Sequence, residues 1–213
     1  MKEATVAIKG MHIAVLGAGS LGWLLAAHTA HAGFLTALED LFPSNLERAQ
    51  NGIRKHLQGL ANSHGVSAAE VEATLARITF VPTIEGAVRE ADLALDCVPD
   101  ELESKLEIFS LLDRMAPPRT IFCTPTRALG IADIASCTYR ADRCVAVRPL
   151  QDGGTDDRYL LATTREVVLA YSHWTRPDVL AAVTAFWRQL GKSVTTEYDG
   201  SFAPPGTMPP AGM

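Results

Sequence analysis

MHIAVLGAGSLGWLLAAHTAHAGFLTALED, the stretch from Met11 to Asp40, decides the fold of this chain. A short apolar run ends at the segment GAGSLG, residues 17–22, and a helical pattern follows it until Gly33. A second apolar run then ends in Glu39 and Asp40. A strand, a tight glycine turn, a helix, a second strand and an acid, in that order, predict the first βαβ unit of a dinucleotide-binding domain.

Each glycine of this segment has a separate expected function. Gly17 makes the tight turn, Gly19 lets the backbone approach a pyrophosphate, and Gly22 allows the helix to pack closely on the strand. The phosphates are expected to bind the N–H groups at the start of the helix, where Ser20 and Leu21 lie. The alternative is a glycine turn that serves packing alone.

Asp40 stands at the end of the second strand, at about the spacing expected of the acid that binds the hydroxyl groups of the adenosine ribose. A carboxylate in this place repels a 2′-phosphate. We therefore expect the cofactor to be NAD rather than NADP.

The composition argues against several classes of function. The chain has 213 residues, of which 47% are hydrophobic, enough for the core of one large domain. Its net charge is −5 and it has no basic stripe, so we expect neither nucleic acid nor a membrane as a partner. The four cysteines form no CxxC pair and no Cys/His metal pattern, which predicts reduced thiols, no metal site and a cytoplasmic protein.

Strands and helices are expected to alternate along the rest of the chain. Residues 1–10 are a short lead-in, residues 11–198 form one domain, and the tail 199–213 is expected to be disordered. A long helical segment, residues 44–76, contains Gly65 between two helices. The predicted fold is α/β: a Rossmann-type, doubly wound, mainly parallel sheet with a projecting helical hairpin.

From Ile13 to about Tyr198 the chain resembles the NAD-binding domain of the L-3-hydroxyacyl-CoA dehydrogenases. Besides the glycine segment and the hairpin, the resemblance is carried by ADLALDCVPDELESK at 91–105, IFCTPTRALGI at 121–131, DRCVAVRPL at 142–150, REVVLA at 165–170 and AVTAFWRQLGK at 182–192.

The resemblance implies further NAD contacts at Asp100 and Lys105. Both residues follow the carboxyl end of the fourth predicted strand, where ligands bind in such sheets. The alternatives are that Asp100 caps its helix and that Lys105 is a solvated surface charge.

Departures from the family concern the substrate side of the site. Arg148, in the segment RPLQD at 148–152, stands where the dehydrogenases carry the acid/base histidine of an HFFNP motif. Glu166 matches the family's partner carboxylate, and Arg127 lies in the segment that supplies a serine near the substrate oxygen. The family's helical C-terminal domain, which dimerises and closes the cleft over the acyl-CoA, has no counterpart in these 213 residues.

The change from histidine to arginine removes the usual acid/base group. Histidine exchanges a proton near neutral pH, whereas arginine, with a pKa above about 12, cannot serve as a general base. Oxidation of an alcohol by the usual route should lose about 10² to 10⁴ in rate. We expect Arg127 and Arg148 at the nicotinamide end, where they could bind a carboxylate or stabilise an oxyanion. The alternative is a structural ion pair between Arg148 and Glu166.

The histidines offer no clear substitute for the missing group. Each is expected to lie on the surface or in packing contacts, and His56 is the exception of most interest because the hairpin borders acyl-CoA in the family. No nucleophile–base pair emerges from the sequence.

Two hypotheses about function follow. The first is an NAD-dependent oxidoreductase resembling 3-hydroxyacyl-CoA dehydrogenase, with Arg148, Glu166 and Arg127 in an altered active site. It would transfer hydride to or from a small hydroxyacyl or acidic substrate, with acyl-CoA one possibility. The second is a catalytically silent NAD-binding module or a subunit of a larger complex; a homodimer or a partner subunit fits either. An acyl-CoA binder without redox chemistry is the least favoured, because the nucleotide signature is better kept than the substrate signature.

Overall fold

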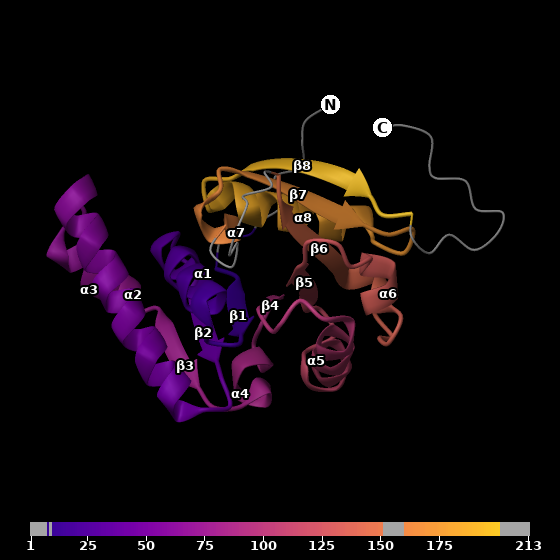
Figure 1. Ribbon diagram of the computed structural model, residues 1–213, viewed down its shortest axis with the longest axis horizontal. Helices are drawn as coiled ribbons and strands as arrows, with labels where there is room; N and C mark the ends of the chain where they lie inside the picture. Colours follow the sequence, from indigo (N-terminus) through magenta and orange to yellow (C-terminus); the bar gives the residue numbers. More distant parts are fainter. Residues whose placement is uncertain (1–7, 9, 151–159, 201–213) are drawn as a thin grey trace.

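The structure, a computed structural model, describes residue 8 and residues 10–150 and 160–200. Its centre is an eight-stranded sheet with the strand order β3-β2-β1-β4-β5-β6-β7-β8 (Figure 1). The strands are β1 His12–Leu16, β2 Leu35–Glu39, β3 Ile78–Val81, β4 Leu93–Asp96, β5 Ile121–Pro125, β6 Cys144–Pro149, β7 Glu166–Tyr171 and β8 Ser193–Tyr198. All neighbouring strands are parallel except β6 and β7. The first six strands have the order of a Rossmann fold, which confirms the predicted architecture.

Helices cover both faces of the sheet (Figure 1). One face packs on α1 and α8, around Leu25, Phe186 and Trp187; the other packs on α4, α5 and α6, around Phe109 and Phe122. Because both faces are covered, every residue of β4 and β5 is buried, including the polar Asp96 and Thr124. The helices are α1 Ser20–His31, α2 Pro43–His64, α3 Ala68–Leu75, α4 Ile84–Val88, α5 Leu102–Met115, α6 Ile131–Ala135, α7 Leu160–Thr163 and α8 Pro177–Gln189, and Ala141–Arg143 form a 3₁₀ turn.

The predicted hairpin is formed by α2 and α3, which lie on the outer side of α1, at the left of Figure 1. Ala49, Ile53 and Leu57 recur on one face of α2 and are buried in the same core as α1. Ser67 and Glu70 form a capping box at the start of α3. The hairpin therefore extends beyond the sheet while its inner face is part of the domain core.

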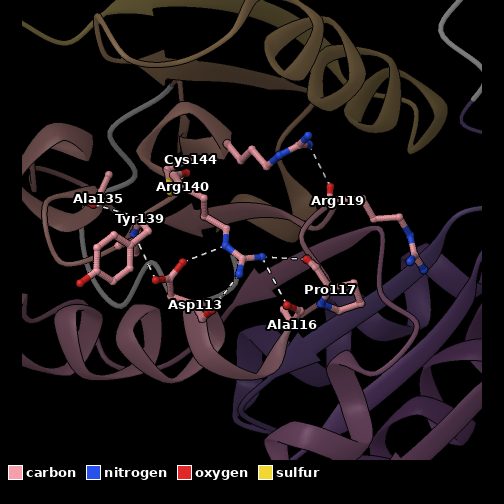
Figure 2. A network of polar contacts seen from close by, with 10 residues as sticks. Asp113, Ala116, Pro117, Arg119, Ala135, Tyr139, Arg140 and Cys144 are labelled. Carbon is pink, nitrogen blue, oxygen red and sulfur yellow. Dashed lines mark hydrogen bonds and ion pairs between the residues drawn. The ribbon is translucent and has the colours of Figure 1, made fainter.

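A network around Arg140 fixes the end of the sheet where β5 and β6 begin (Figure 2). The Arg140 Nε atom donates to Asp113 Oδ1 at 2.8 Å, and Nη1 donates to the Pro117 carbonyl at 2.7 Å. The guanidinium also lies 5.2 Å from the centre of the Phe122 ring. These contacts therefore tie the end of α5 to the segment before β6.

The predicted domain boundary at residue 198 is too early. Asp199 donates its N–H to the Tyr171 carbonyl at 2.8 Å, and its carboxylate accepts from the Ile131 N–H at 2.7 Å, so it belongs to the folded domain rather than to a tail. The expectations for residues 201–213, for most of the lead-in 1–10 and for Gln151 and Asp152 lie outside the described residues.

Candidate functional site

A cavity of about 1050 Å³ lies at the carboxyl ends of the central strands. The glycine turn after β1, the end of β2, the loop after β4 and the ends of β5 and β6 all contribute to its wall. Ligands bind at this edge in open parallel sheets. Among the predicted site residues, its wall includes Gly17, Gly19, Ser20, Leu21, Asp40, Asp100 and Arg127.

The glycine turn has little room for side chains. Gly17 has a φ of +95°, which other residues rarely adopt. A Cβ atom on Gly22 would lie 1.8 Å from the Gly17 carbonyl oxygen, so only glycine allows the turn and the helix to lie this close. A Cβ atom on Gly19, in contrast, would meet nothing within 4 Å. The backbone at Gly19 is thus open toward the cavity.

The start of α1 leaves backbone donors for an anion. Gly19 is the N-cap residue of this twelve-residue helix, and no side chain caps it. The first N–H groups of a helix lack partners within the helix and carry the positive end of its dipole. An open backbone at Gly19, together with these donors, fits the diphosphate of a dinucleotide.

Asp40 follows β2 and faces the same cavity. Its Oδ2 atom accepts from the Ala18 N–H at 2.9 Å, while Oδ1 accepts from the Phe42 N–H at 3.0 Å and the Asn45 side-chain amide at 2.9 Å. These donors fix the carboxylate beside the glycine turn, a position compatible with the expected ribose contact. Asn45, which the sequence did not identify, holds it from the first turn of α2.

Asp100 and Arg127 meet on the cavity wall. The Arg127 backbone N–H donates to Asp100 Oδ2 at 2.8 Å, which joins the loops after β4 and β5. The alternative that Asp100 caps its helix is wrong, because Glu101 is the N-cap residue of α5 and no side chain caps that helix. The cofactor contact of Asp100 remains a prediction.

Lys105 lies beneath the cavity wall rather than on it. It is 1% exposed, and its Nζ atom lies 3.0 Å from Asp96 Oδ2. Asp96 also accepts from Thr124 Oγ1 at 2.9 Å and the Val98 N–H at 3.0 Å. The alternative of a solvated surface charge is therefore wrong: the ammonium neutralises a buried carboxylate that the sequence did not single out. The pair supports the loop 97–100 from below.

Arg148 points away from the cavity, although its neighbours Val147 and Pro149 line it. Side chains alternate along a strand, so Arg148 lies on the opposite face of β6. Its Nη2 atom donates to the Leu129 carbonyl at 3.0 Å and lies 3.7 Å from Asp199 Oδ2. Its buried Nε atom has no hydrogen-bond partner in the described part of the chain.

Glu166 is exposed at the start of β7, and no ion pair joins it to Arg148 within the described segments. The alternative of a structural ion pair between these two residues is therefore wrong, because the carboxylate that lies near Arg148 is that of Asp199. Sequence reasoning missed Asp199 because it assigned this residue to the tail. The catalytic roles of Arg148, Glu166 and Arg127 remain predictions.

Glu39, next to Asp40, is a further wall residue that sequence reasoning left without a function. It is 7% exposed; burial, and after it the charge of Asp40, raise the pKa of Glu39 to about 7. A carboxyl group at the end of a buried strand was the signal that could have identified it.

The described histidines lie outside the cavity wall. His56 packs between α1 and α2, where its ring centre lies 5.5 Å from that of His28. The pKa of His28 is lowered to about 4, mainly because the imidazole is buried. Within residues 8, 10–150 and 160–200, no group of three or more His, Cys, Asp or Glu side chains is placed to hold a metal ion. The same residues contain no helix that is both long and apolar enough to span a membrane.

Comparison with known proteins places this chain in a family. Residues 12–199 match the family described as 3-hydroxyacyl-CoA dehydrogenase, NAD binding domain. The chain is 33% identical over 135 residues to the probable 3-hydroxybutyryl-CoA dehydrogenase of Bacillus subtilis, covering 63% of this chain and 47% of that protein. It is 31% identical over 137 residues to the mitochondrial hydroxyacyl-coenzyme A dehydrogenase of Rattus norvegicus, covering 62% and 44%.

The same fold occurs in the crystal structure of 3-hydroxybutyryl-CoA dehydrogenase from Escherichia coli. That structure superposes with a TM-score of 0.81 at 23% identity, covering 90% of this chain and 39% of the other. The chain spans less than half the length of these curated relatives.

Proposed function

The chain belongs to the 3-hydroxyacyl-CoA dehydrogenase family through its NAD-binding domain, and from this premise we propose that it is an NAD-dependent oxidoreductase with an altered substrate end. Its substrate would be a small hydroxyacyl or acidic compound, with acyl-CoA one candidate. The observation that carries the proposal is the open backbone at Gly19 above an uncapped α1, with Asp40 fixed beside it.

In this proposal one end of the cavity binds the cofactor and the other end binds the substrate. The N–H groups at the start of α1 and the Asp40 carboxylate would hold NAD, whose nicotinamide supplies hydride chemistry when bound. At the other end, Arg127 would orient an acidic or thioester substrate from the cavity wall. Neither arginine can accept a proton, so we expect turnover to be about 10² to 10⁴ slower than with a histidine acid/base.

A cofactor measurement tests the first half of this proposal. Calorimetry with NADH and NADPH should give tighter binding of NADH, because Asp40 repels the 2′-phosphate of NADPH. Tighter binding of NADPH would contradict the function assigned to Asp40.

A turnover measurement tests the second half. Acetoacetyl-CoA and NADH should be consumed slowly at high enzyme concentration. If the site is a degenerate dehydrogenase, Arg148→His should increase the rate, provided that the new side chain turns from the Leu129 side of β6 toward the cavity. Loss of an existing activity in Arg148→His would instead show a recruited arginine. Arg143→His is a matched control, because Arg143 lies just before the opposite end of the same strand and its side chain donates to the Arg119 carbonyl.

A catalytically silent NAD-binding module is the second candidate. It is favoured by the engagement of Arg148 with Leu129 and Asp199, which leaves the family's acid/base position on the far face of β6. NADH binding without turnover, in both the native chain and Arg148→His, would support this alternative over the first.

A further inference from the structure

Glu39 is a carboxyl group of the nucleotide cavity to which the proposed function gives no role. It is the last residue of β2 and lies between the ends of β1 and β3, beside Gly17 and Asp40 on the cavity wall. With only 7% of its surface exposed, it has little contact with bulk water that could screen its charge. A charge on Glu39 would therefore act strongly on the glycine turn.

The cavity wall is already negative. Its charged side chains in the described chain are three other carboxylates and one arginine: Asp40, Asp100, Glu107 and Arg127. The neighbouring segment 78–88, which contains β3 and α4, adds only the exposed Glu85. NAD would add a negatively charged diphosphate at the glycine turn. An ionised Glu39 would then be one more negative charge in a poorly solvated place.

We propose that NAD binds to the form of the protein in which Glu39 is protonated, so that each binding event takes up a proton from solvent at neutral and alkaline pH. A neutral carboxyl group can donate a hydrogen bond to an acceptor oxygen, whereas a carboxylate can only accept. The pKa of Glu39, raised to about 7 by burial and by Asp40, makes this proton exchangeable near neutral pH. The inference rests on NAD binding at the glycine turn.

Calorimetry of NADH binding to the full chain tests the inference directly. The titrations are made between pH 6 and pH 8 in phosphate and in Tris, two buffers with different enthalpies of ionisation. With a pKa of about 7 in the free protein, the affinity should fall about tenfold from pH 6 to pH 8, and nearly one proton should be taken up per NADH at pH 8. This measurement needs no variant.

A pair of variants tests whether Glu39 is the group that takes up the proton. Glu39→Gln is neutral and nearly isosteric, so it should bind NADH with little pH dependence and about tenfold more tightly than the native chain at pH 8. Glu47→Gln is the control, because Glu47 is exposed on α2 and lies outside the cavity wall. It should keep the pH dependence of the native chain.

Stability without dinucleotide provides a second measurement. The folded chain holds the Glu39 proton more tightly than the unfolded chain, in which the carboxyl has its ordinary pKa of 4.5. The contribution of Glu39 to the free energy of unfolding should therefore decrease as the pH rises from about 4.5 to about 7, and it should vanish in Glu39→Gln.

The outcomes separate this inference from the cofactor assignment. NADH binding without proton uptake at pH 8, or the same pH dependence in Glu39→Gln as in the native chain, would overturn the role of Glu39 alone. Failure of NADH to bind at any pH would overturn the assignment of NAD and the role of Glu39 together.

Discussion

The two ends of the cavity are built from different parts of the polypeptide. At the nucleotide end the backbone forms the site: Gly17 turns the chain, Gly19 leaves it open, and α1 supplies N–H groups. At the other end, where the family resemblance predicts side chains that bind the substrate, Arg148 points away from the cavity and contacts Leu129 and Asp199. A backbone site requires glycines at fixed spacing, whereas a side-chain site depends on contacts that only the folded chain reveals.

Lys105→Met should have the largest effect on stability. It tests whether the buried pair of Lys105 and Asp96 supports the loop 97–100, which lies between the two ends of the cavity. The variant leaves Asp96 as an uncompensated buried charge, which should cost about 3 to 5 kcal/mol in the free energy of unfolding. Urea denaturation measures this loss, with Lys55→Met, an exposed lysine on α2, as the control. A tenfold loss of NADH affinity without a loss of stability would instead support the direct NAD contact implied by the family.

Gly22→Ala tests the backbone design of the nucleotide end. The added Cβ atom would overlap the Gly17 carbonyl oxygen, so the turn must move; we expect a loss of about 3 kcal/mol in stability and weak or no NADH binding. Gly59→Ala on α2 is the matched control, because its Cβ meets nothing within 4 Å and should stabilise the helix by about 0.5 to 1 kcal/mol. Native stability and NADH affinity in Gly22→Ala would show that the turn does not need this glycine.

Arg148→Gln should have the smallest effect, and it tests whether the substrate end is separate from the cofactor. Loss of the contacts with Leu129 and Asp199 should lower the free energy of unfolding by about 1 to 2 kcal/mol and leave NADH affinity within about twofold. Arg54→Gln, from an exposed pair with Glu72, should lower it by less than about 1 kcal/mol. A tenfold fall in NADH affinity would place Arg148 at the nicotinamide end after all.

The sequence predicted the alternation of strands and helices, the hairpin and the glycine turn because these depend on local patterns. Gly65 ends α2 with a φ of +72°, and Ser67 and Glu70 cap the next helix; both are features of a few neighbouring residues. The burial of Lys105 could not be predicted in this way, since its partner Asp96 comes from β4 and Thr124 from β5. The sequence also could not predict which face of β6 the Arg148 side chain occupies, because a shift of one residue in the strand register moves every side chain to the other face.

The pairing of β1 with β4 has a consequence for folding during translation. Ile13 lies beside Leu93, and Gly17 fits against the Cys97 carbonyl, although some eighty residues of chain separate these partners. The glycine turn is translated before its neighbouring wall, which it acquires only after residue 97 has emerged. Contacts of such long sequence separation form slowly, so the nascent chain must carry an unpaired β1 edge until β4 has been synthesised. Until then the glycine turn lacks the wall residues that the loop after β4 supplies, so NAD would have no complete site to occupy.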